Sequence, residues 1–281
     1  MNSKAFRSNK MTKGAAYFVL GLYTIIVAYP LIFLFITSLK TNAEFFTNLF
    51  GLAQKPEWSN YANAWTTGKL GFYFGNSMII TISSVIATSI FSLLGGYALG
   101  KLNIPKANLI MSILMVFNFI PGIAIYISLF QMLGQLKMTS SYFAIIIPYI
   151  AWHLPFSMYI FKQYFETIPH EMIESGRIDG CTELKTFTHI MLPLVTPALA
   201  TVIVFTFIGN WGELIWASIV TSSNVRIKTL PVGLLNFRSE LGIDWGMYTA
   251  GISMVTLPLM CVFAYFQKYF VAGLTNGAVK G

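Results

Sequence analysis

Six long apolar runs dominate the sequence and restrict the folds open to it. They cover residues 15–39, 74–99, 109–130, 142–160, 194–220 and 246–267, and only the fifth contains an Asp, Glu, Lys or Arg. Uncharged stretches of about 18 or more residues are candidate membrane-spanning helices. Only 10% of the 281 residues are charged, which is rare in a soluble domain of this size. We therefore expect an all-α integral membrane protein, a single transmembrane domain over residues 1–281 with six transmembrane helices.

The basic residues predict which side of the membrane holds the two ends of the chain. Six of the 18 Lys and Arg residues lie in the N-terminal segment and in the tight loop after the second run, namely Lys4, Arg7, Lys10, Lys13, Lys101 and Lys106, and the positive charges on the other side lie mainly in the longer connections. An excess of Lys and Arg in short loops marks the cytoplasmic side. The first run is too long for a signal peptide and lacks a convincing cleavage site, so we expect it to be retained. With six spans, both termini then lie in the cytoplasm.

A polar segment, residues 171–193, separates the fourth and fifth apolar runs. It holds four of the ten acidic residues of the chain, namely Glu171, Glu174, Asp179 and Glu183. With both termini in the cytoplasm, this segment lies in the cytoplasm too. So much charge in one loop of an apolar chain indicates that the loop meets a soluble partner.

The residue types in this segment predict a helix, a turn and a second helix. Pro169 suits a first helical turn, where its missing N–H costs nothing. Gly180 can take the left-handed conformation that ends a helix, and Thr182 suits the N-cap of the next one. Pro193 marks the following boundary. Each helix has an apolar side, formed by Met172, Ile173 and Gly176 in the first and by Leu184, Phe187 and Met191 in the second.

The same segment resembles the EAA loop of ABC importer permeases, whose pattern is EAA-x3-G-x9-I-x-LP. The matching residues are Glu174-Ser175-Gly176, Gly180, Ile190 and Leu192-Pro193, with the spacing of that pattern throughout. Ser175 and Gly176 stand in place of two alanines, and both are small. In such importers the loop docks in a cleft on a cytoplasmic ATPase subunit. The resemblance implies the type I ABC importer permease fold and a coupling loop over residues 164–193, with ATPase-coupling residues Glu171, Glu174, Gly176, Arg177, Asp179, Gly180 and Pro193.

A second resemblance lies in the fifth apolar run. Residues 210–216 resemble the WNEFLW-like stretch of carbohydrate permeases of the maltose-transporter type, which implies that Asn210, Trp211 and Glu213 lie on the sugar path. Glu213 is the one acidic residue inside an expected span, and such a carboxylate should face the bundle interior or a water-filled path. The alternative is a structural carboxylate that caps a neighbouring helix.

Two further polar residues are candidates for the substrate path. Asn118 lies in the third run and His153 in the fourth. Asn118 alternatively bonds a neighbouring helix, and His153 alternatively is a core histidine whose hydrogen bonds are satisfied. Pro121-Gly122, just beyond Asn118, predicts a kink in the third span.

The last nine residues, 273–281, resemble the C-terminal end of the maltose-type permease subunit whose tail reaches into the ATPase dimer. The resemblance implies ATPase contacts from Asn276, Gly277 and Lys280, since small residues let the backbone enter a narrow gap. The alternative is a frayed terminus.

The sequence carries no motif for catalysis on this chain. It contains no GxxxxGK[ST], GxSxG or HExxH segment, and Cys181 and Cys261 have no CxxC partner or metal-ligand spacing. The sequence has no basic patch interleaved with aromatic residues, so nothing in it indicates nucleic-acid binding. We therefore expect a transport subunit with no cofactor, metal or catalytic residue of its own, and ATP with Mg²⁺ bound by a partner.

Together these features predict the permease subunit of a bacterial ABC importer for sugars, in the cell membrane. The resemblance implies a second homologous permease chain, a cytoplasmic ATPase dimer and an extracytoplasmic solute-binding protein as partners. Two alternatives stay open: a permease of this type for a non-sugar solute, and a proton-coupled secondary transporter that uses Glu213 and His153. A membrane-embedded enzyme is disfavoured because the spans hold no polar catalytic cluster.

Overall fold

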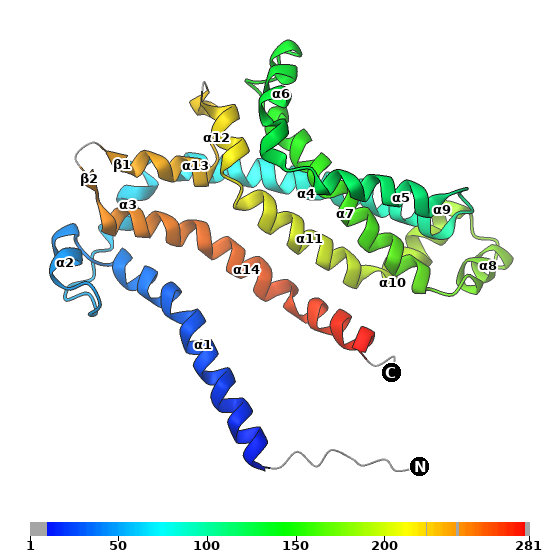
Figure 1. Ribbon diagram of the computed structural model, residues 1–281, viewed down its shortest axis with the longest axis horizontal. Coiled ribbons are helices and arrows are strands. Elements are labelled where there is room, and N and C mark those ends of the chain that lie inside the picture. The colour runs from blue at the N-terminus through cyan, green and yellow to red at the C-terminus, as the bar shows by residue number, and fades with distance from the viewer. Residues whose placement is uncertain (1–9, 223, 240–241, 279–281) are drawn as a thin grey trace. The chain divides into compact units, whose positions relative to one another are not determined.

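The computed structural model describes residues 10–222, 224–239 and 242–278, and the side chains of residues 13–222, 224–237 and 242–268. Nearly all of this chain is helical (Figure 1). The helices are α1 (Lys10–Ser38), α2 (Asn42–Thr47), α3 (Ser59–Trp65), α4 (Leu70–Lys101), α5 (Ala107–Val116), η1 (Phe117–Phe119), α6 (Gly122–Gln135), α7 (Phe143–Thr167), α8 (Glu171–Ile178), α9 (Glu183–Lys185), the π-helical η2 (Thr186–Met191), α10 (Leu192–Leu194), α11 (Thr196–Trp211), α12 (Ile215–Thr221), η3 (Val225–Ile227), α13 (Leu230–Leu234), η4 (Leu235–Phe237) and α14 (Trp245–Ala278). Two short strands, β1 (Arg238–Ser239) and β2 (Gly242–Ile243), form an antiparallel pair.

Six membrane spans are available in the described residues if two broken helices are each counted once. Four single helices are long and apolar enough to cross a bilayer, within α1, α4, α7 and α14. Two bent pairs meet the same criteria together. One joins residues 107–119 to 122–135 with a bend of 93°, and the other joins 183–194 to 196–211 with a bend of 74°. The expected all-α fold with six transmembrane helices is therefore confirmed.

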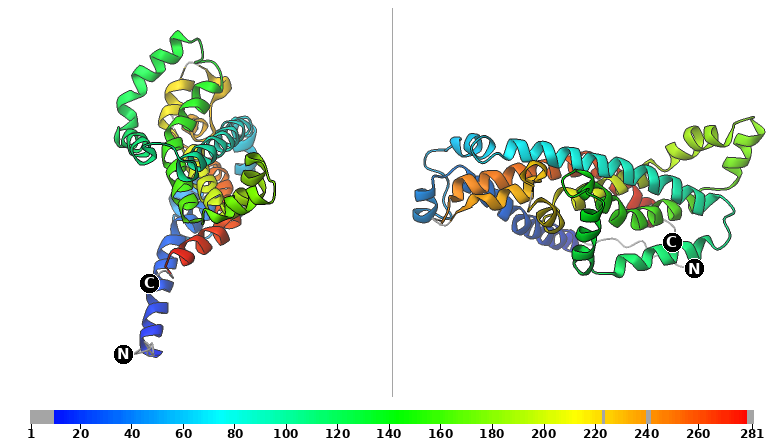
Figure 2. Two further views of the ribbon diagram at one scale, coloured as in Figure 1. Left: turned by 90° about the vertical axis from the view of Figure 1, so that its right-hand side faces the viewer. Right: turned by 90° about the horizontal axis from the view of Figure 1, so that it is seen from above.

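The third span is broken at the expected proline. Ile120 ends η1 in an extended conformation, and Pro121 is extended as well, with a ψ of 120°. Proline offers no N–H to continue a helix and disfavours helical backbone in the residue before it. The predicted kink is confirmed as a sharp break, beyond which α6 leaves the line of α5 (Figure 2).

The fifth span differs from the single helix expected over residues 194–220. Helix α11 ends at Trp211, and residues 212–214 separate it from α12. The start of the fifth span also differs from the prediction, because the bend falls at Val195 rather than at Pro193. Pro193 lies two residues before that bend, inside the continuous helical run of α9, η2 and α10.

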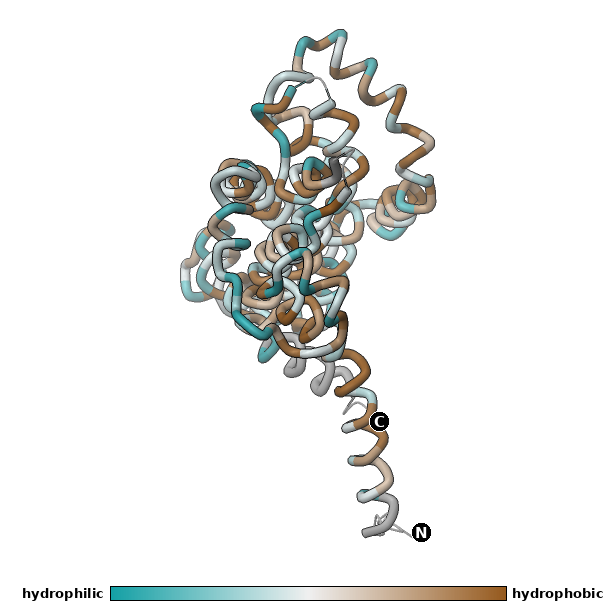
Figure 3. The backbone as a smooth tube through the Cα atoms, turned by 90° about the vertical axis from the view of Figure 1, so that its left-hand side faces the viewer, coloured by the Kyte–Doolittle hydropathy of each residue, from teal (hydrophilic) through white to brown (hydrophobic). Residues whose placement is uncertain are grey.

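The chain forms two compact units, the first made of residues 10–68 and 236–254. In it the Asn60 amide donates to the carbonyl oxygens of Ser38 and Lys40, at 3.0 and 2.8 Å. The buried Lys40 ammonium donates to the carbonyl oxygens of Asn48 and Leu49, at 2.6 and 3.1 Å. These bonds satisfy carbonyl groups that helix ends leave free. Helix α1 is hydrophobic along most of its length, as a span requires (Figure 3).

The second unit contains residues 69–235 and 255–278 and is built around α4, α7 and α11. Gly95 and Gly96 of α4 permit a close contact with α7. A Cβ built on Gly96 would lie 2.5 Å from Phe161 Cβ, and one on Gly95 would lie 2.4 Å from Met158 Cε. Small residues at such a contact let two helix backbones approach, which fixes α4 against α7.

Candidate functional site

The polar segment forms a helical hairpin, here called the polar hairpin and defined as residues 171–194. Helix α8 is its first arm, and α9, η2 and α10 make its second arm. The hairpin projects beyond the ends of α4 and α7 (Figure 1 and Figure 2). It follows α7 after a linker of three residues, 168–170. The hairpin is therefore adjacent in sequence to the end of a membrane helix.

Gly180 makes the turn between the two arms. Its φ is +78°, in the left-handed region. The Cys181 N–H donates to the Gly176 carbonyl at 2.9 Å and the Gly180 N–H to the Arg177 carbonyl at 3.0 Å. This pair of bonds is the Schellman motif, which closes a helix C-terminus. The predicted left-handed turn is confirmed.

The second arm begins at the predicted cap. The Thr182 hydroxyl accepts a hydrogen bond from the Lys185 N–H at 3.4 Å, so Thr182 is the N-cap. Pro169 lies just before α8 rather than in its first turn, and its carbonyl accepts from the Met172 N–H at 3.4 Å. The hairpin is thus set by residues whose signals are local in sequence.

The two arms pack tightly through small and apolar side chains. Ile173, Thr186 and Met191 are fully buried. A Cβ built on Gly176 would lie 2.7 Å from Ile190 Cδ1, so even an alanine there would require the Ile190 side chain to move. Gly176 therefore has a structural reason to be small, which agrees with the small residue of the EAA-like pattern.

The outer face of the polar hairpin combines charge with exposed apolar side chains. Glu171, Glu174 and Asp179 are exposed. Ile178 is 86% exposed and Leu184 is 71% exposed. Leu184 therefore does not join the buried side of the second arm, and Ile178 was not singled out from the sequence. A solvent-facing surface that mixes large apolar residues with charges is typical of an interaction site.

One ion pair links the arms across the turn. Arg177 Nε donates to Glu183 Oε1 at 2.8 Å, with both side chains about half exposed. The hydrogen bond to Glu183 raises the pKa of Arg177, so the guanidinium stays charged. Exposed pairs add little stability. We expect this pair to orient the surface rather than to hold the fold.

A second group of predicted site residues lies where α11 ends. The Glu213 carboxylate accepts the Trp216 N–H at 2.8 Å and the Ala217 N–H at 2.9 Å. These are orphan donors of the first turn of α12, which carries a partial positive charge. The Tyr149 hydroxyl, from α7, donates to the same carboxylate at 2.7 Å. Glu213 therefore caps α12 and ties it to α7.

Trp211 is fully buried beside this cap. Its indole N–H donates to the Val255 carbonyl at 2.9 Å. Its ring contacts Phe207 and Phe74, each with centroids 5.5 Å apart. Both the ring and the N–H are occupied by the protein itself.

Asn210 and His153 differ from Glu213 in how their polar atoms are used. Asn210 is 4% exposed, and within the described chain neither its Oδ1 nor its Nδ2 makes a hydrogen bond of ordinary length, although its amide interacts with the His153 side chain of α7. The His153 ring lies against the preceding residue, since a Cβ on Gly209 would be 2.6 Å from His153 Cε1. The fold thus brings together His153, Asn210, Trp211 and Glu213, whereas Asn118 is exposed in η1. An amide carries two donor hydrogens and an acceptor oxygen, so Asn210 keeps hydrogen-bonding capacity for a ligand hydroxyl beyond its interaction with His153.

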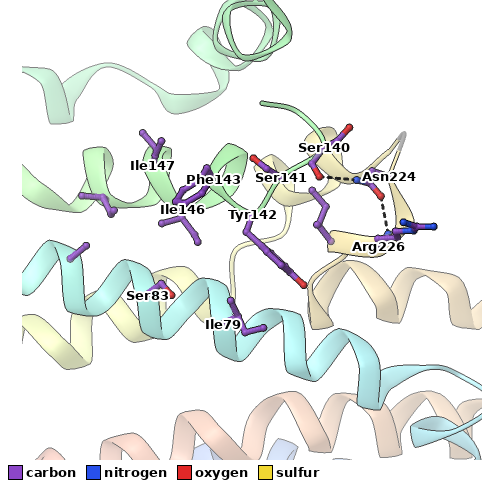
Figure 4. Close-up of a pocket in the computed structure, with 13 residues that line it drawn as sticks. Ile79, Ser83, Ser140, Ser141, Tyr142, Phe143, Ile146, Ile147, Asn224 and Arg226 are labelled. Carbon is purple, nitrogen blue, oxygen red and sulfur yellow. Dashed lines mark hydrogen bonds between the residues drawn. The ribbon is translucent and has the colours of Figure 1, made fainter. Parts of the chain in front are cut away.

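A separate groove of about 1070 Å³ lies between α4 and the start of α7 (Figure 4). Its walls include Ile79, Ile146 and Ile147, and one end holds Ser140, Asn224 and Arg226. The Asn224 amide donates to the Ser140 carbonyl at 3.3 Å. None of the five residues predicted for the substrate path lines this groove.

The C-terminal tail is described only in part. Helix α14 runs to Ala278, so the backbone of Asn276 and Gly277 is helical. The Asn276 side chain, and Lys280 as a whole, lie outside the described residues. The predicted ATPase contacts of the tail stay predictions.

The fold defines a multi-pass α-helical membrane protein, and the comparisons with known proteins give its family. The family described as binding-protein-dependent transport system inner membrane component matches residues 92–276. The chain belongs to this family, as the EAA-like segment predicted. Its fold is the type I ABC importer permease fold.

Relatives and a solved structure agree with this assignment. The arabinooligosaccharides transport system permease protein of Halalkalibacterium halodurans is 34% identical and aligns over 91% of this chain and 92% of its own. The trehalose/maltose transport system permease protein of Thermococcus litoralis is 33% identical over 92% of this chain and 94% of its own. A chain from the crystal structure of a bacterial ABC transporter involved in the import of the acidic polysaccharide alginate has a TM-score of 0.80, with 24% identity over 94% of this chain and 98% of its own. That last likeness supports the fold alone.

Proposed function

We propose that this chain is the permease subunit of an ATP-driven, binding-protein-dependent importer for sugars or oligosaccharides. The substrate class is supported by the relatives named for arabinooligosaccharides and for trehalose and maltose. In this proposal a second homologous permease chain completes the pathway. An ATPase dimer in the cytoplasm binds ATP and Mg²⁺, and an extracytoplasmic binding protein delivers the sugar.

One observation carries the coupling part of the proposal: the polar hairpin is rigid inside and exposed outside. Its turn is fixed by Gly180 and its arms by buried Ile173 and Met191. Its outer face offers Ile178 and Leu184 among acidic residues, with large exposed fractions. A rigid body that presents a mixed surface is suited to dock on a soluble subunit and to move as one piece with it.

The proposed mechanism is a population shift. Closure of the ATPase dimer on ATP moves the docked hairpin, and the hairpin moves the end of α7. A ligand shifts an equilibrium between two states only through its different interaction with each. The docked ATPase supplies that difference here, and the membrane helices pass between inward-open and outward-open states. Both termini lie in the cytoplasm, and residues 273–281 add a second contact with the ATPase.

The proposed sugar path runs past Asn210 and His153. The buried Asn210 amide makes no hydrogen bond of ordinary length within the described chain, which supports a hydrogen bond to a sugar hydroxyl. Glu213 and Trp211 shape the same region from their fixed positions, and Asn118 lines the path at the break of the third span. The same region would serve a non-sugar solute, so an uptake screen with several sugars and with amino acids decides the substrate class.

Site-directed cross-linking tests the proposed coupling. Ile178→Cys, in a chain with Cys181→Ser and Cys261→Ser, is expected to cross-link to the nucleotide-binding subunit in membranes of cells that express the whole transporter. Val225→Cys is the matched control, because Val225 is also exposed, at 54%, but lies in η3. Capture of the ATPase at position 225 and not at 178, or labelling of position 178 from outside the cell, would overturn the proposal.

The proton-coupled alternative predicts different behaviour. Uptake would continue without the ATPase subunit and would stop when an uncoupler collapses the proton gradient. Uptake by the assembled complex in vesicles that requires internal ATP and survives the uncoupler excludes it.

A further inference from the structure

A buried lysine lies in the last turns of α7, just before the polar hairpin. The Lys162 side chain is 3% exposed. Its ammonium donates to Glu166 Oε1 at 2.6 Å and to Asn108 Oδ1 at 2.8 Å. A buried charge is costly to keep unless it is paired and hydrogen-bonded. The chain keeps this charge and provides both partners.

The two partners come from different helices. Glu166 lies one turn further along α7, whereas Asn108 lies in the first turn of α5. Lys162 therefore joins the end of α7 to the start of the broken third span. Glu166 is also held by the Gln163 amide at 3.2 Å.

Helix α4 packs closely against the backbone of the same turn of α7. A Cβ on Gly96 would lie 3.0 Å from the Lys162 nitrogen, and a Cβ on Gly100 would lie 3.1 Å from the Lys162 carbonyl oxygen. Two glycines four residues apart let helices approach closely. Beyond them, Lys101 Nζ donates to the Ile168 carbonyl oxygen, inside the linker that leads to α8.

These contacts place one residue at the meeting point of α4, α5 and α7, about a turn and a half before the hairpin linker. We propose that Lys162, with Asn108 and Glu166, is the joint that transmits movement of the polar hairpin to α5, while the α4 glycines hold the same turn of α7 in place. Lys162 is a positioning residue, and the inference rests on the proposed coupling function. Without the joint the end of α7 slides past α5, and ATPase closure no longer drives the membrane helices.

The test uses the complete transporter in proteoliposomes with its binding protein. The variant Lys162→Met/Glu166→Gln removes both charges together, so neither is left unpaired. We expect the ATPase to remain bound and ATP hydrolysis to continue, while sugar transported per ATP hydrolysed falls about tenfold, within the usual range of a coupling effect. The single variant Lys162→Arg keeps the positive charge and the hydrogen-bond donors. We expect its ratio of sugar transported to ATP hydrolysed to match that of the wild type.

Gln163→Ala is the matched control, because it removes a bond to Glu166 from the exposed side and does not reach α5. An unchanged transport ratio in the double variant, with the ATPase bound, overturns the joint and leaves the proposed function intact. If the wild-type chain itself does not bind the ATPase, the proposed function is refuted instead. Should the double variant fail to assemble, Asn108→Leu decides: it cuts only the link to α5, and a normal ratio there refutes the inference.

Discussion

The polar hairpin and the cap at the end of α11 use acidic residues in opposite ways. In the hairpin, Glu171, Glu174 and Asp179 face solvent. In the cap, Glu213 accepts three hydrogen bonds, from Tyr149, Trp216 and Ala217. The exposed carboxylates of the hairpin are available to bind another molecule, whereas the Glu213 carboxylate is already hydrogen-bonded within the chain. An acidic residue in a transporter thus indicates a partner only when its own fold leaves it unpaired.

Glycines in the two kinds of region also differ, and Gly180 of the hairpin contrasts with the glycines of the membrane helices. Gly180 has open space around it but a positive φ, so its constraint is conformational. Gly96 and Gly100 face close neighbours, so their constraint is steric. The predictions below test each region by the kind of constraint it carries, from the largest expected effect to the smallest.

Gly180→Val should have the largest effect. A non-glycine residue in the left-handed region costs about 1–2 kcal/mol, and a β-branched residue costs more. We expect the turn to open, the ATPase to dissociate and uptake to be lost, with the chain still in the membrane. The measurement is uptake together with retention of the ATPase on purification.

Two further variants control this experiment. Gly180→Asn should keep most uptake, because Asn tolerates the left-handed conformation. Gly134→Val, at a helical glycine with equally open space, should be near normal. Normal uptake by Gly180→Val would refute the importance of the turn.

Ile178→Glu combined with Leu184→Glu should have the next largest effect. Both side chains are exposed, so their replacement leaves the internal packing intact. Central apolar residues of an interface each contribute on the order of 1–2 kcal/mol, so ATPase affinity should fall roughly tenfold or more. The measurement is a binding titration with the purified ATPase. An unchanged affinity would show that this face does not dock.

Glu213→Gln should have an intermediate effect and distinguishes its two interpretations. The amide has one acceptor oxygen, so at least one of the three bonds is lost. If Glu213 serves only as a cap, the Glu213→Gln substitution should lower the free energy of unfolding by about 1–2 kcal/mol and leave the apparent KM for sugar unchanged. A raised KM without loss of thermal stability would instead assign Glu213 to the sugar. Melting of the purified complex and initial uptake rates are the two measurements.

Tyr149→Phe should have the smallest effect. It removes one hydrogen bond to Glu213 and leaves the two bonds to α12 in place. We expect a loss of about 1 kcal/mol in stability and near-normal uptake. A loss of uptake as large as that of Glu213→Gln would mean that the carboxylate and the hydroxyl act together on the substrate.

Features that depend on neighbours in sequence were predicted well. The turn at Gly180, the cap at Thr182 and the break at Pro121 all follow from the backbone preferences of single residues. The break between α11 and α12 was not predicted, because Gly212 and Glu213 also fit a continuous span. It exists because the Glu213 carboxylate starts a new helix and Tyr149, 64 residues earlier, holds it there.

Other parts of the candidate site had no local signal at all. Lys162 was not singled out from the sequence, and its buried ammonium is paired with Asn108, which is 54 residues away. Ile178 is one apolar residue among many, and only the packing of α8 on its other side leaves it exposed. Asn210 was a candidate by resemblance, but its lack of a hydrogen bond of ordinary length is a property of the packed helices.

The amino-acid sequence by itself determined the membrane class, the number of spans and the position and turn of the hairpin, because hydropathy and backbone preference act over a few residues. The tertiary structure alone decided which charged and polar side chains are satisfied. Hydrogen bonding of Glu213, Lys162 and Asn210 depends on atoms brought close from distant helices, and pairing of that kind is set by packing rather than by any single stretch of chain.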